Sequence, residues 1–357
     1  MKVPRLKIVV FGLSITSSWG NGHATTYRGL IRALVARGHE VLFLERDVPW
    51  YAAARDLPKP PYGRTVLYKN LSAMQRRFIS KVRRADLVVV GSYVPDAIAI
   101  GEWVVAHARG ITAFYDIDTP ITLEMIRRGG APYLSLDLIA RYRLYLSFTG
   151  GPLLKVLEKR YRAPLARPLY CSVDPRLYYP ETQIEQWDLG YMGTYSRDRQ
   201  PVLEQLLIEP ARRCSGARMV VAGPQYPGSI RWPSNIERIE HLAPRAHRRF
   251  YNRQAFTLNV TRKCMVRAGY SPSVRLFESA ACGRPIVSDY WPGLEEFFKP
   301  EEEILIADKP EDILRYMRRI PAAERRRIGN AARRRVLAAH TAAHRAEELE
   351  NYVMEAC

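Results

Sequence analysis

The stretch Ser271-Pro-Ser-Val-Arg-Leu-Phe-Glu-Ser-Ala-Ala-Cys-Gly-Arg-Pro-Ile-Val-Ser-Asp289 decides the fold expected for this 357-residue chain. Its first part predicts a helix, because Ser271 and Ser273 are residue types that cap a helix start and Gly283 is a typical helix stop. The apolar run 285–288 that follows predicts a short buried strand. A helix that begins at this point directs its free N–H groups and the positive end of its dipole toward an anion such as a diphosphate.

The helix predicted over 273–282 carries a cation and an acid on one arc. At about 100° per residue, Arg275 and Glu278 lie on the same face as Ser279, and the apolar side chains lie opposite. Arg275 suits a phosphate group and Glu278 suits the hydroxyls of a sugar. Periodicity alone leaves an alternative open, which is a solvated helix face with a surface ion pair.

This stretch, continued into Tyr290-Trp-Pro-Gly-Leu-Glu-Glu-Phe-Phe298, closely resembles the carboxy-terminal domain of glycosyltransferases with the GT-B fold. Within them it is most similar to the group named after the spore-maturation protein CgeB, and the similarity is strongest over residues 185–310. In the wider family the helix carries a glutamate that hydrogen-bonds the ribose of the nucleotide, and Glu278 occupies that position. A second glutamate usually stands eight residues earlier, where this chain has Tyr270, so the paired motif is half missing.

The order of apolar segments agrees with a two-domain α/β protein. A chain of 357 residues exceeds the size at which one hydrophobic core usually keeps growing. Strand-like and helix-like segments alternate along both halves, which is typical of parallel sheets covered on both faces. We expect strands at 7–12, 40–45, 65–68, 87–90, 112–115, 145–148, 189–192, 219–222, 236–239, 257–260, 285–288 and 304–306.

We therefore predict two Rossmann-like doubly wound domains that face each other across a cleft, as in the GT-B fold. The resemblance makes residues 1–165 the acceptor-side domain and residues 175–338 the nucleotide-sugar-binding domain. It also implies that a last helix, over about residues 340–357, packs back on the first domain.

The charge balance is strongly basic, with 55 Lys and Arg against 36 Asp and Glu and a formal net charge of +19. Such an excess predicts an anionic partner, for which the candidates are a nucleotide diphosphate, a lipid-linked diphosphate acceptor, an anionic membrane surface and nucleic acid. An ordinary solvated surface is the alternative, and nucleic acid is the least expected of these partners.

The five cysteines are widely spaced and form neither a Cys-x-x-Cys pair nor a Cys/His cluster. This pattern indicates a reducing compartment and argues against structural zinc. No apolar run approaches the length of a membrane span. We expect a cytoplasmic protein, with peripheral docking on the inner face of the membrane as an open alternative.

In the first domain, the loop after the first strand carries Gly20 and Gly22 and leads to His23 at a helix start. The two glycines permit turns with positive φ and a close approach of backbone to an acceptor. The Gly-His entry resembles a loop in several GT-B enzymes whose histidine removes the proton of the acceptor hydroxyl. An imidazole with a pKa near 6.5 suits that role. The alternative is a histidine that only hydrogen-bonds its own loop.

Asp116-Ile-Asp118 follows the fifth expected strand. We predict that Asp118 belongs to the catalytic group and orients His23 or the acceptor. Two alternatives stay open, namely that Asp118 or Thr119 caps the next helix, and that the Asp-x-Asp pair binds a metal ion. Because GT-B enzymes generally use helix dipoles and basic side chains instead, we expect no metal ion and no cofactor.

In the second domain, basic and small residues follow the strand ends where a diphosphate would lie. Guanidinium groups bind phosphate oxygens bidentately, although exposed loop arginines are also common. The residues predicted to bind the donor are Gly193, Thr194, Arg197, Arg199, Arg262, Ser273, Val274, Arg275 and Glu278.

The resemblance and these residues predict a metal-independent glycosyltransferase of the hexosyltransferase type. It would move a sugar from a nucleotide-diphosphate sugar to a carbohydrate, lipid-linked or small-molecule acceptor in polysaccharide or glycoconjugate biosynthesis. If the reaction inverts the anomeric carbon, His23 is the base, and if it retains configuration, the leaving phosphate takes the proton and His23 positions the acceptor. The alternatives are a non-hydrolysing nucleotide-sugar epimerase and an inactive basic protein that binds anions or membranes.

Overall fold

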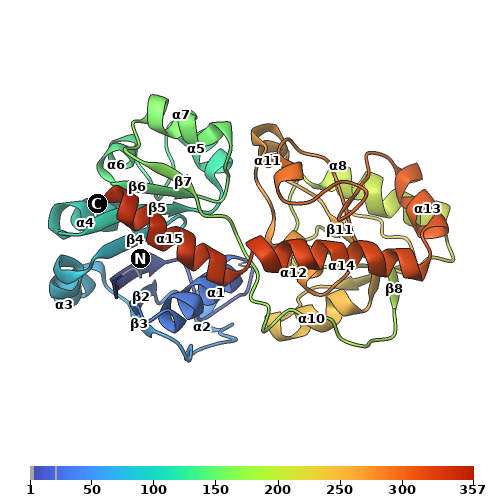
Figure 1. The fold of residues 1–357 in the computed structure, drawn as a ribbon, viewed down its shortest axis with the longest axis horizontal. Helices are drawn as coiled ribbons and strands as arrows, with labels where there is room; N and C mark the ends of the chain where they lie inside the picture. Colours follow the sequence, from blue (N-terminus) through green and yellow to red (C-terminus); the bar gives the residue numbers. More distant parts are fainter. Residues whose placement is uncertain (1–3, 21) are drawn as a thin grey trace. The chain divides into compact units, whose positions relative to one another are not determined.

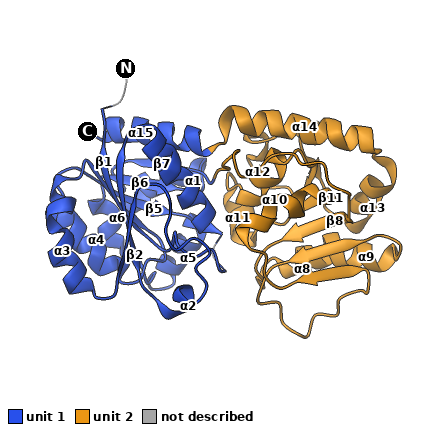
Figure 2. Cartoon of the chain, turned by 90° about the horizontal axis from the view of Figure 1, so that it is seen from below, with its two compact units in different colours: residues 1–171, 342–357 blue, residues 172–341 orange. Residues whose placement is uncertain are grey.

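The computed structural model describes residues 4–20 and 22–357, which form two compact units (Figure 2). Unit 1 comprises residues up to 171 together with 342–357, and unit 2 comprises residues 172–341. Each unit has its own parallel sheet with helices beside it. The predicted fold class, two doubly wound α/β domains, is confirmed.

Unit 1 is built on a seven-stranded sheet in the order β3-β2-β1-β4-β5-β6-β7, with all neighbouring strands parallel. Its strands are β1 (Lys7–Gly12), β2 (Glu40–Arg46), β3 (Arg64–Tyr68), β4 (Leu87–Gly91), β5 (Ile111–Asp116), β6 (Leu144–Ser147) and β7 (Ala166–Pro168). Its helices are α1 (His23–Ala36), α2 (Pro49–Ala52), α3 (Leu71–Arg84), α4 (Ala97–His107), α5 (Thr119–Arg127), α6 (Leu136–Arg141), α7 (Pro152–Tyr161) and α15 (Ala342–Ala356) (Figure 1).

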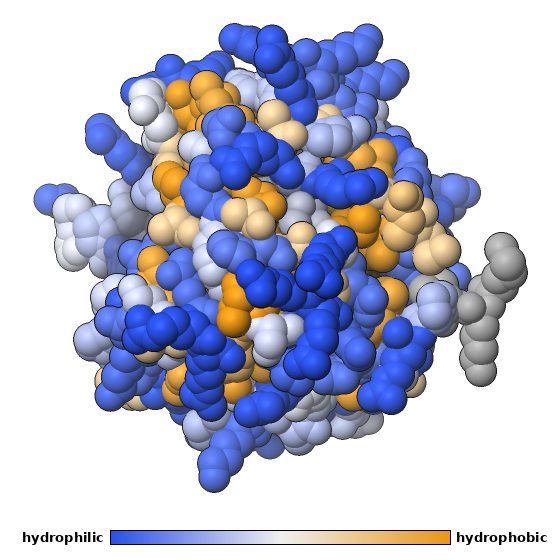
Figure 3. All heavy atoms as spheres, turned by 90° about the vertical axis from the view of Figure 1, so that its left-hand side faces the viewer, coloured by the Kyte–Doolittle hydropathy of each residue, from blue (hydrophilic) through white to orange (hydrophobic). Residues whose placement is uncertain are grey.

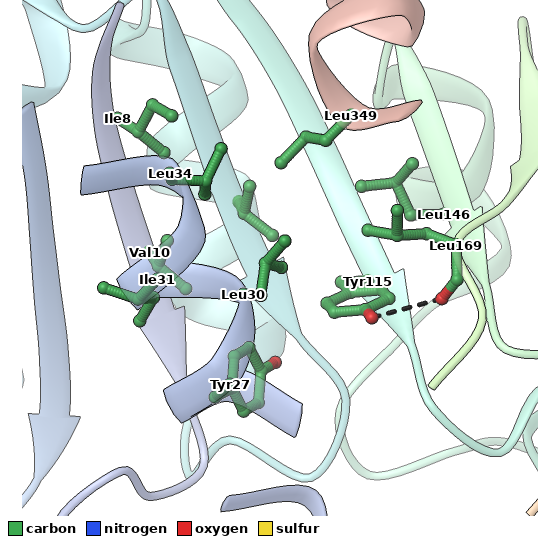
Figure 4. Close-up of a pocket in the computed structure, with 11 residues that line it drawn as sticks. Ile8, Val10, Tyr27, Leu30, Ile31, Leu34, Tyr115, Leu146, Leu169 and Leu349 are labelled. Carbon is green, nitrogen blue, oxygen red and sulfur yellow. Dashed lines mark hydrogen bonds between the residues drawn. The ribbon is translucent and has the colours of Figure 1, made fainter. Parts of the chain in front are cut away.

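The central strands of unit 1 are continuous apolar runs because both faces of the sheet are covered. On β1, Val9 and Phe11 belong to the core shared with α3, α4 and α6. Ile8 and Val10 point to the opposite face and line a small cavity beside α1 and α15 (Figure 4). The lining of this cavity is apolar apart from two tyrosines, so it offers little to a polar ligand and we interpret it as a packing gap.

The last helix, α15, belongs to unit 1, where it packs on α1. Glu350 accepts hydrogen bonds from Nε and Nη2 of Arg37 at 2.6 Å each and lies 2.6 Å from Nε2 of His39. The Arg37 hydrogen bonds and the nearby His39 hold the pKa of Glu350 below its usual range. His39 Nδ1 also accepts from the Leu6 amide. His39 is therefore a packing residue that joins the start of β1 to α15.

Part of the charge excess lies on α3 of unit 1. Its apolar side chains Met74, Phe78 and Val82 are buried, and its basic side chains are exposed. Hydrophilic side chains dominate the side of unit 1 on which α3 and α4 lie (Figure 3). In the described part of the chain, no helix combines the length and apolar character needed to cross a bilayer. The exposed basic residues of α3 are Arg76, Arg77, Lys81, Arg83 and Arg84.

Unit 2 is built on a six-stranded parallel sheet in the order β10-β9-β8-β11-β12-β13. Its strands are β8 (Trp187–Met192), β9 (Met219–Ala222), β10 (Ile236–Ile239), β11 (Gln254–Asn259), β12 (Ile286–Ser288) and β13 (Leu305–Ile306). Its helical segments are α8 (Gln200–Leu203), the π-helix η1 (Glu204–Ile208), α9 (Glu209–Arg213), α10 (Pro244–Asn252), α11 (Lys263–Ala268), α12 (Val274–Ala281), the 3-10 helix η2 (Leu294–Glu296), α13 (Pro310–Arg319) and α14 (Ala322–Ala339).

Candidate functional site

The strand order of unit 2 reverses between β8 and β11. In open parallel sheets, ligands bind outside the carboxyl ends of the strands at such a reversal. The strand ends here are Met192 and Asn259, and α12 begins beside them with Ser273 at its N-cap. This edge is therefore the candidate ligand site of unit 2.

Arg275 joins the two strand ends at this reversal. Its side chain is buried, with 7% of the residue exposed. Nε donates to the Met192 carbonyl at 2.5 Å, Nη1 donates to Asn259 Oδ1 at 2.6 Å, and the guanidinium lies 4.7 Å from the centre of the Tyr191 ring. Within residues 4–20 and 22–357, Nη2 has no hydrogen-bond partner. Arg275 thus ties the two strand ends together and leaves one nitrogen without a hydrogen-bond partner among the described residues.

A network of polar side chains supports the start of α12. The Ser273 hydroxyl donates to Asn259 Oδ1 at 2.8 Å, and the Asn259 amide donates to Ser288 at 2.9 Å. Asp289 accepts from the amide and the hydroxyl of Thr261, and burial raises the pKa of this carboxyl. Since Ser273 is used in this way, no side chain of the described residues caps α12. The first turn of the helix, beginning at Val274, keeps amides that can bind an anion.

Glu278 lies deeper than the sequence indicated. Only 2% of the residue is exposed, and its carboxylate accepts a hydrogen bond from the Tyr251 hydroxyl at 2.9 Å. Arg275 and Glu278 therefore bond to different partners. The alternative of a solvated helix face with a surface ion pair is wrong, because both side chains are buried.

The loop after β8 approaches Arg275 closely. A Cβ at Gly193 would lie 2.5 Å from the Tyr191 hydroxyl and 3.0 Å from Arg275 Nη2, so a glycine makes room for both side chains. The carbonyl of Thr194 accepts from Arg199 Nη2 at 2.7 Å. The loop is thus fixed by one of the arginines that were predicted to bind the donor.

The other two predicted arginines differ in their surroundings. Arg262 forms a 3.5 Å ion pair with Asp198. Burial favours a higher pKa for Asp198, but the Ser196 hydroxyl and the charges of Arg262 and Arg199 outweigh it and hold the pKa below its usual range. Arg197 is exposed and has no partner among the described residues, so it is the most accessible of the four arginines predicted to bind the donor.

In unit 1 the strand order reverses between β1 and β4. The loop after β1 is anchored by the buried carboxylate of Glu45 at the end of β2. Glu45 accepts from the Ser14 hydroxyl, the Ile15 amide, and both the amide and the hydroxyl of Thr16, at 2.6–3.1 Å. Arg28 of α1 adds a hydrogen bond to the Ile15 carbonyl at 2.8 Å. The base of the loop is therefore rigid, and sequence reasoning missed Glu45.

His23 begins α1 at the end of this loop. Its ring lies parallel to that of Tyr93, at 7° and a centroid distance of 6.3 Å, and meets Phe148 edge-on. The Tyr93 hydroxyl donates to Asp118 Oδ2 at 2.9 Å. The structure therefore connects the two predicted catalytic residues, His23 and Asp118, through a tyrosine that sequence reasoning missed. The sequence feature that could have pointed to Tyr93 is its place just after the apolar strand β4.

Two details of this site differ from expectation. Gly20 has φ +60°, but Gly22 has φ −63° and occupies the N-cap of α1 in a right-handed conformation, so only Gly20 needs to be glycine for its φ. Asp118 is at the N-cap of α5, yet its carboxylate bonds Tyr93 and no side-chain cap is formed within the described residues. The capping alternative is therefore wrong for the Asp118 side chain.

Asp116 is buried beneath Asp118. It accepts from the hydroxyls of Tyr145 at 2.5 Å and Thr122 at 2.9 Å. Burial raises its pKa to about 6, and these hydrogen bonds offset only part of that effect. Over residues 4–20 and 22–357, no group of three or more His, Cys, Asp or Glu side chains could hold a metal ion.

We expect ionisation of Asp116 to destabilise the protein between pH 4 and pH 6. The folded pKa of about 6 lies above the unfolded value, so the stability that this group contributes is complete below about pH 4 and is lost as pH rises through 6. A shift of about two pKa units corresponds to about 3 kcal/mol. Urea unfolding of the wild type and of Asp116→Asn at pH 4.5 and pH 7 measures this loss. Equal pH slopes for the two proteins would contradict it.

Comparisons with known proteins bear on these two sites. Residues 199–351 match the family model described as glycosyl transferase-like. No curated protein matches the chain.

Among solved structures, sucrose-phosphate synthase from Thermosynechococcus elongatus matches with a TM-score of 0.72 and 14% identity, covering 98% of this chain and 99% of that one. Anabaena HepE in complex with UDP and glucose matches with a TM-score of 0.73 and 12% identity, covering 98% and 100%. An alpha-glucosyltransferase in complex with UDP and DNA matches with a TM-score of 0.70 and 13% identity, again covering 98% and 100%. Such identities show the fold alone. The chain thus has the GT-B fold, and its carboxy-terminal part matches a family of glycosyl transferase-like proteins.

Proposed function

We propose that this protein is a metal-independent glycosyltransferase of the CgeB-like group and the hexosyltransferase type. It transfers a sugar from a nucleotide-diphosphate sugar to an acceptor hydroxyl in polysaccharide or glycoconjugate synthesis. The observation that carries the proposal is the uncapped start of α12 beside Arg275 at the strand reversal of unit 2. The glycosyl transferase-like match over residues 199–351 and the UDP and UDP-glucose bound to HepE support it.

Unit 2 supplies the groups that stabilise the leaving diphosphate. Negative charge builds on this group as the bond to the sugar breaks, and preorganised donors lower the barrier. The amides at Val274 and Arg275, the free Nη2 of Arg275 and the open guanidinium of Arg197 provide such donors. Guanidinium forks match phosphate oxygens, so these groups can take the part that a metal ion plays elsewhere.

Unit 1 supplies the groups that act on the acceptor. His23 accepts the acceptor proton if the reaction inverts the anomeric carbon. If the reaction retains configuration, the leaving phosphate takes this proton and His23 positions the hydroxyl. Both roles need a fixed imidazole, and the Glu45-anchored loop and Tyr93 meet that need. An epimerase would convert the nucleotide sugar with no acceptor present, so omission of the acceptor separates the two functions.

Arg197→Ala should weaken nucleotide diphosphate binding by about 10–100-fold, because a hydrogen bond to a charged group contributes about 1.5–3 kcal/mol. UDP, GDP and dTDP are first compared by thermal stabilisation, since a ligand that binds only the native state raises its stability. Calorimetry then measures the dissociation constant of the tightest one.

Arg326→Ala on α14 is the matched control, because Arg326 is also exposed in unit 2. Both variants should unfold at the wild-type temperature, and only Arg197→Ala should lose affinity. Failure of all three nucleotides to bind, or equal affinity of the two variants, would refute the donor site.

A further inference from the structure

Tyr93 has a backbone conformation that its residue type disfavours. Its φ is +64°, in the left-handed region that glycine and asparagine adopt at lower cost. Strain of this kind persists where the surrounding structure determines it, often at functional sites. Tyr93 follows β4, one of the two strands at the reversal of unit 1. A glycine at position 93 would adopt this backbone conformation with less strain, yet the chain has a tyrosine there.

The side chain of Tyr93 is held from two directions. Its hydroxyl donates to Asp118 Oδ2 at 2.9 Å, and its ring lies 4.6 Å from the ring of Tyr133. Tyr133 is in turn 2.9 Å from the Thr122 hydroxyl, which donates to Asp116 at 2.9 Å. This chain of contacts connects the ring to the buried end of β5. The place of the Tyr93 ring is therefore fixed independently of His23.

The ring of Tyr93 then defines the plane of the His23 imidazole. The two rings are parallel within 7°, and Phe148 closes the edge of the imidazole at 77°. Two aromatic neighbours at nearly perpendicular angles restrict rotation of the imidazole about both of its side-chain bonds. The Tyr93 hydroxyl points to Asp118, so it passes no proton to His23 and acts through geometry.

We propose that Tyr93 is a positioning residue that transmits the fixed position of Asp118 to the imidazole of His23. The role of the pair in sugar transfer rests on the proposed function, but the geometric coupling does not. Misplacement of a reacting group by about 1 Å can cost about 100-fold in rate, so loss of this support should lower turnover without weakening donor binding.

The test compares Tyr93→Phe, which keeps the ring, with Tyr93→Ala, which removes it. The first readout is the His23 imidazole resonance in NMR spectra of the protein without ligand, assigned by its disappearance in His23→Gln. We expect a small change of this resonance in Tyr93→Phe and a large change, with line broadening, in Tyr93→Ala. Asp96→Gly is the control, since Asp96 at the N-cap of α4 is exposed, also has a positive φ of +60°, and should leave the resonance in place when replaced.

The second readout is turnover of UDP-glucose, measured as UDP release. We expect kcat to fall about tenfold in Tyr93→Phe and about 100-fold in Tyr93→Ala, with KM for UDP-glucose within twofold of the wild type. An unchanged His23 resonance in Tyr93→Ala would overturn the proposal whether or not the wild type turns over UDP-glucose. A perturbed resonance together with no nucleotide binding or turnover would support the coupling and refute the proposed function instead.

Discussion

Glu45→Ala should lower the free energy of unfolding by about 3–5 kcal/mol, because it removes a charged acceptor that several buried neutral donors share. The Glu45 carboxylate accepts four hydrogen bonds from the loop after β1. Alanine would leave the Ile15 and Thr16 amides and two hydroxyls without this partner. A buried donor without a partner costs its full desolvation penalty.

Glu40→Ala is the matched control for Glu45→Ala. Glu40 begins the same strand β2, but its side chain is exposed, so its removal should change stability by less than about 0.5 kcal/mol. Urea unfolding followed by tryptophan fluorescence measures both variants. A loss below 1 kcal/mol in Glu45→Ala would show that the loop finds other partners and is not anchored by this carboxylate.

His23→Ala should lower the rate of sugar transfer by about 10²–10⁴-fold in an inverting reaction, the usual contribution of a general base. Nucleotide affinity should stay within twofold, because the predicted donor-binding residues all belong to unit 2 whereas His23 belongs to unit 1. A retaining reaction would show a smaller loss, since the leaving phosphate then takes the proton. The anomeric configuration of the product, read by NMR, identifies which of the two applies.

His241→Ala is the matched control for His23→Ala. His241 is exposed in unit 2 and has no partner among the described residues, so its removal should leave transfer unchanged. Full transfer activity in His23→Ala would remove this histidine from the mechanism and would leave Asp118 as the candidate base in unit 1.

The strands could be predicted from the sequence because each is a short apolar run between polar or glycine-bearing segments. All twelve expected strands are present with ends within a few residues of the prediction. The strand β7 was missed, since Ala166–Pro168 has three residues and ends in proline, which carries little strand signal. The helix stop at Gly283, with φ +70°, was visible for the same local reason.

The candidate site was predicted only in part. The positions of Asp118 and Gly193 just after strands, and of His23 and Arg275 at helix starts, follow from the alternation of elements. The burial of the side chains on α12 did not follow, since periodicity left open a solvated polar arc and the structure buries Arg275 and Glu278. The helix α12 packs against β11 and β12 and against both α10 and α14, so its polar face is buried too, and no local pattern predicts this.

Local sequence patterns were enough to predict twelve of the thirteen strands, where α12 begins and ends, and that small and basic residues follow the strands. These features depend on neighbours a few residues apart. Three contacts became visible only in the folded chain: Glu45 anchors the first loop, Tyr93 joins Asp118 to His23, and Arg275 ties Met192 to Asn259. The Ile15–Glu45, Tyr93–Asp118 and Met192–Arg275 partners are separated by 30, 25 and 83 residues. They meet because β1 neighbours β2, β4 neighbours β5 and β8 neighbours β11. The order of strands in each sheet brings these groups together, and that order is set by packing between distant parts of the chain.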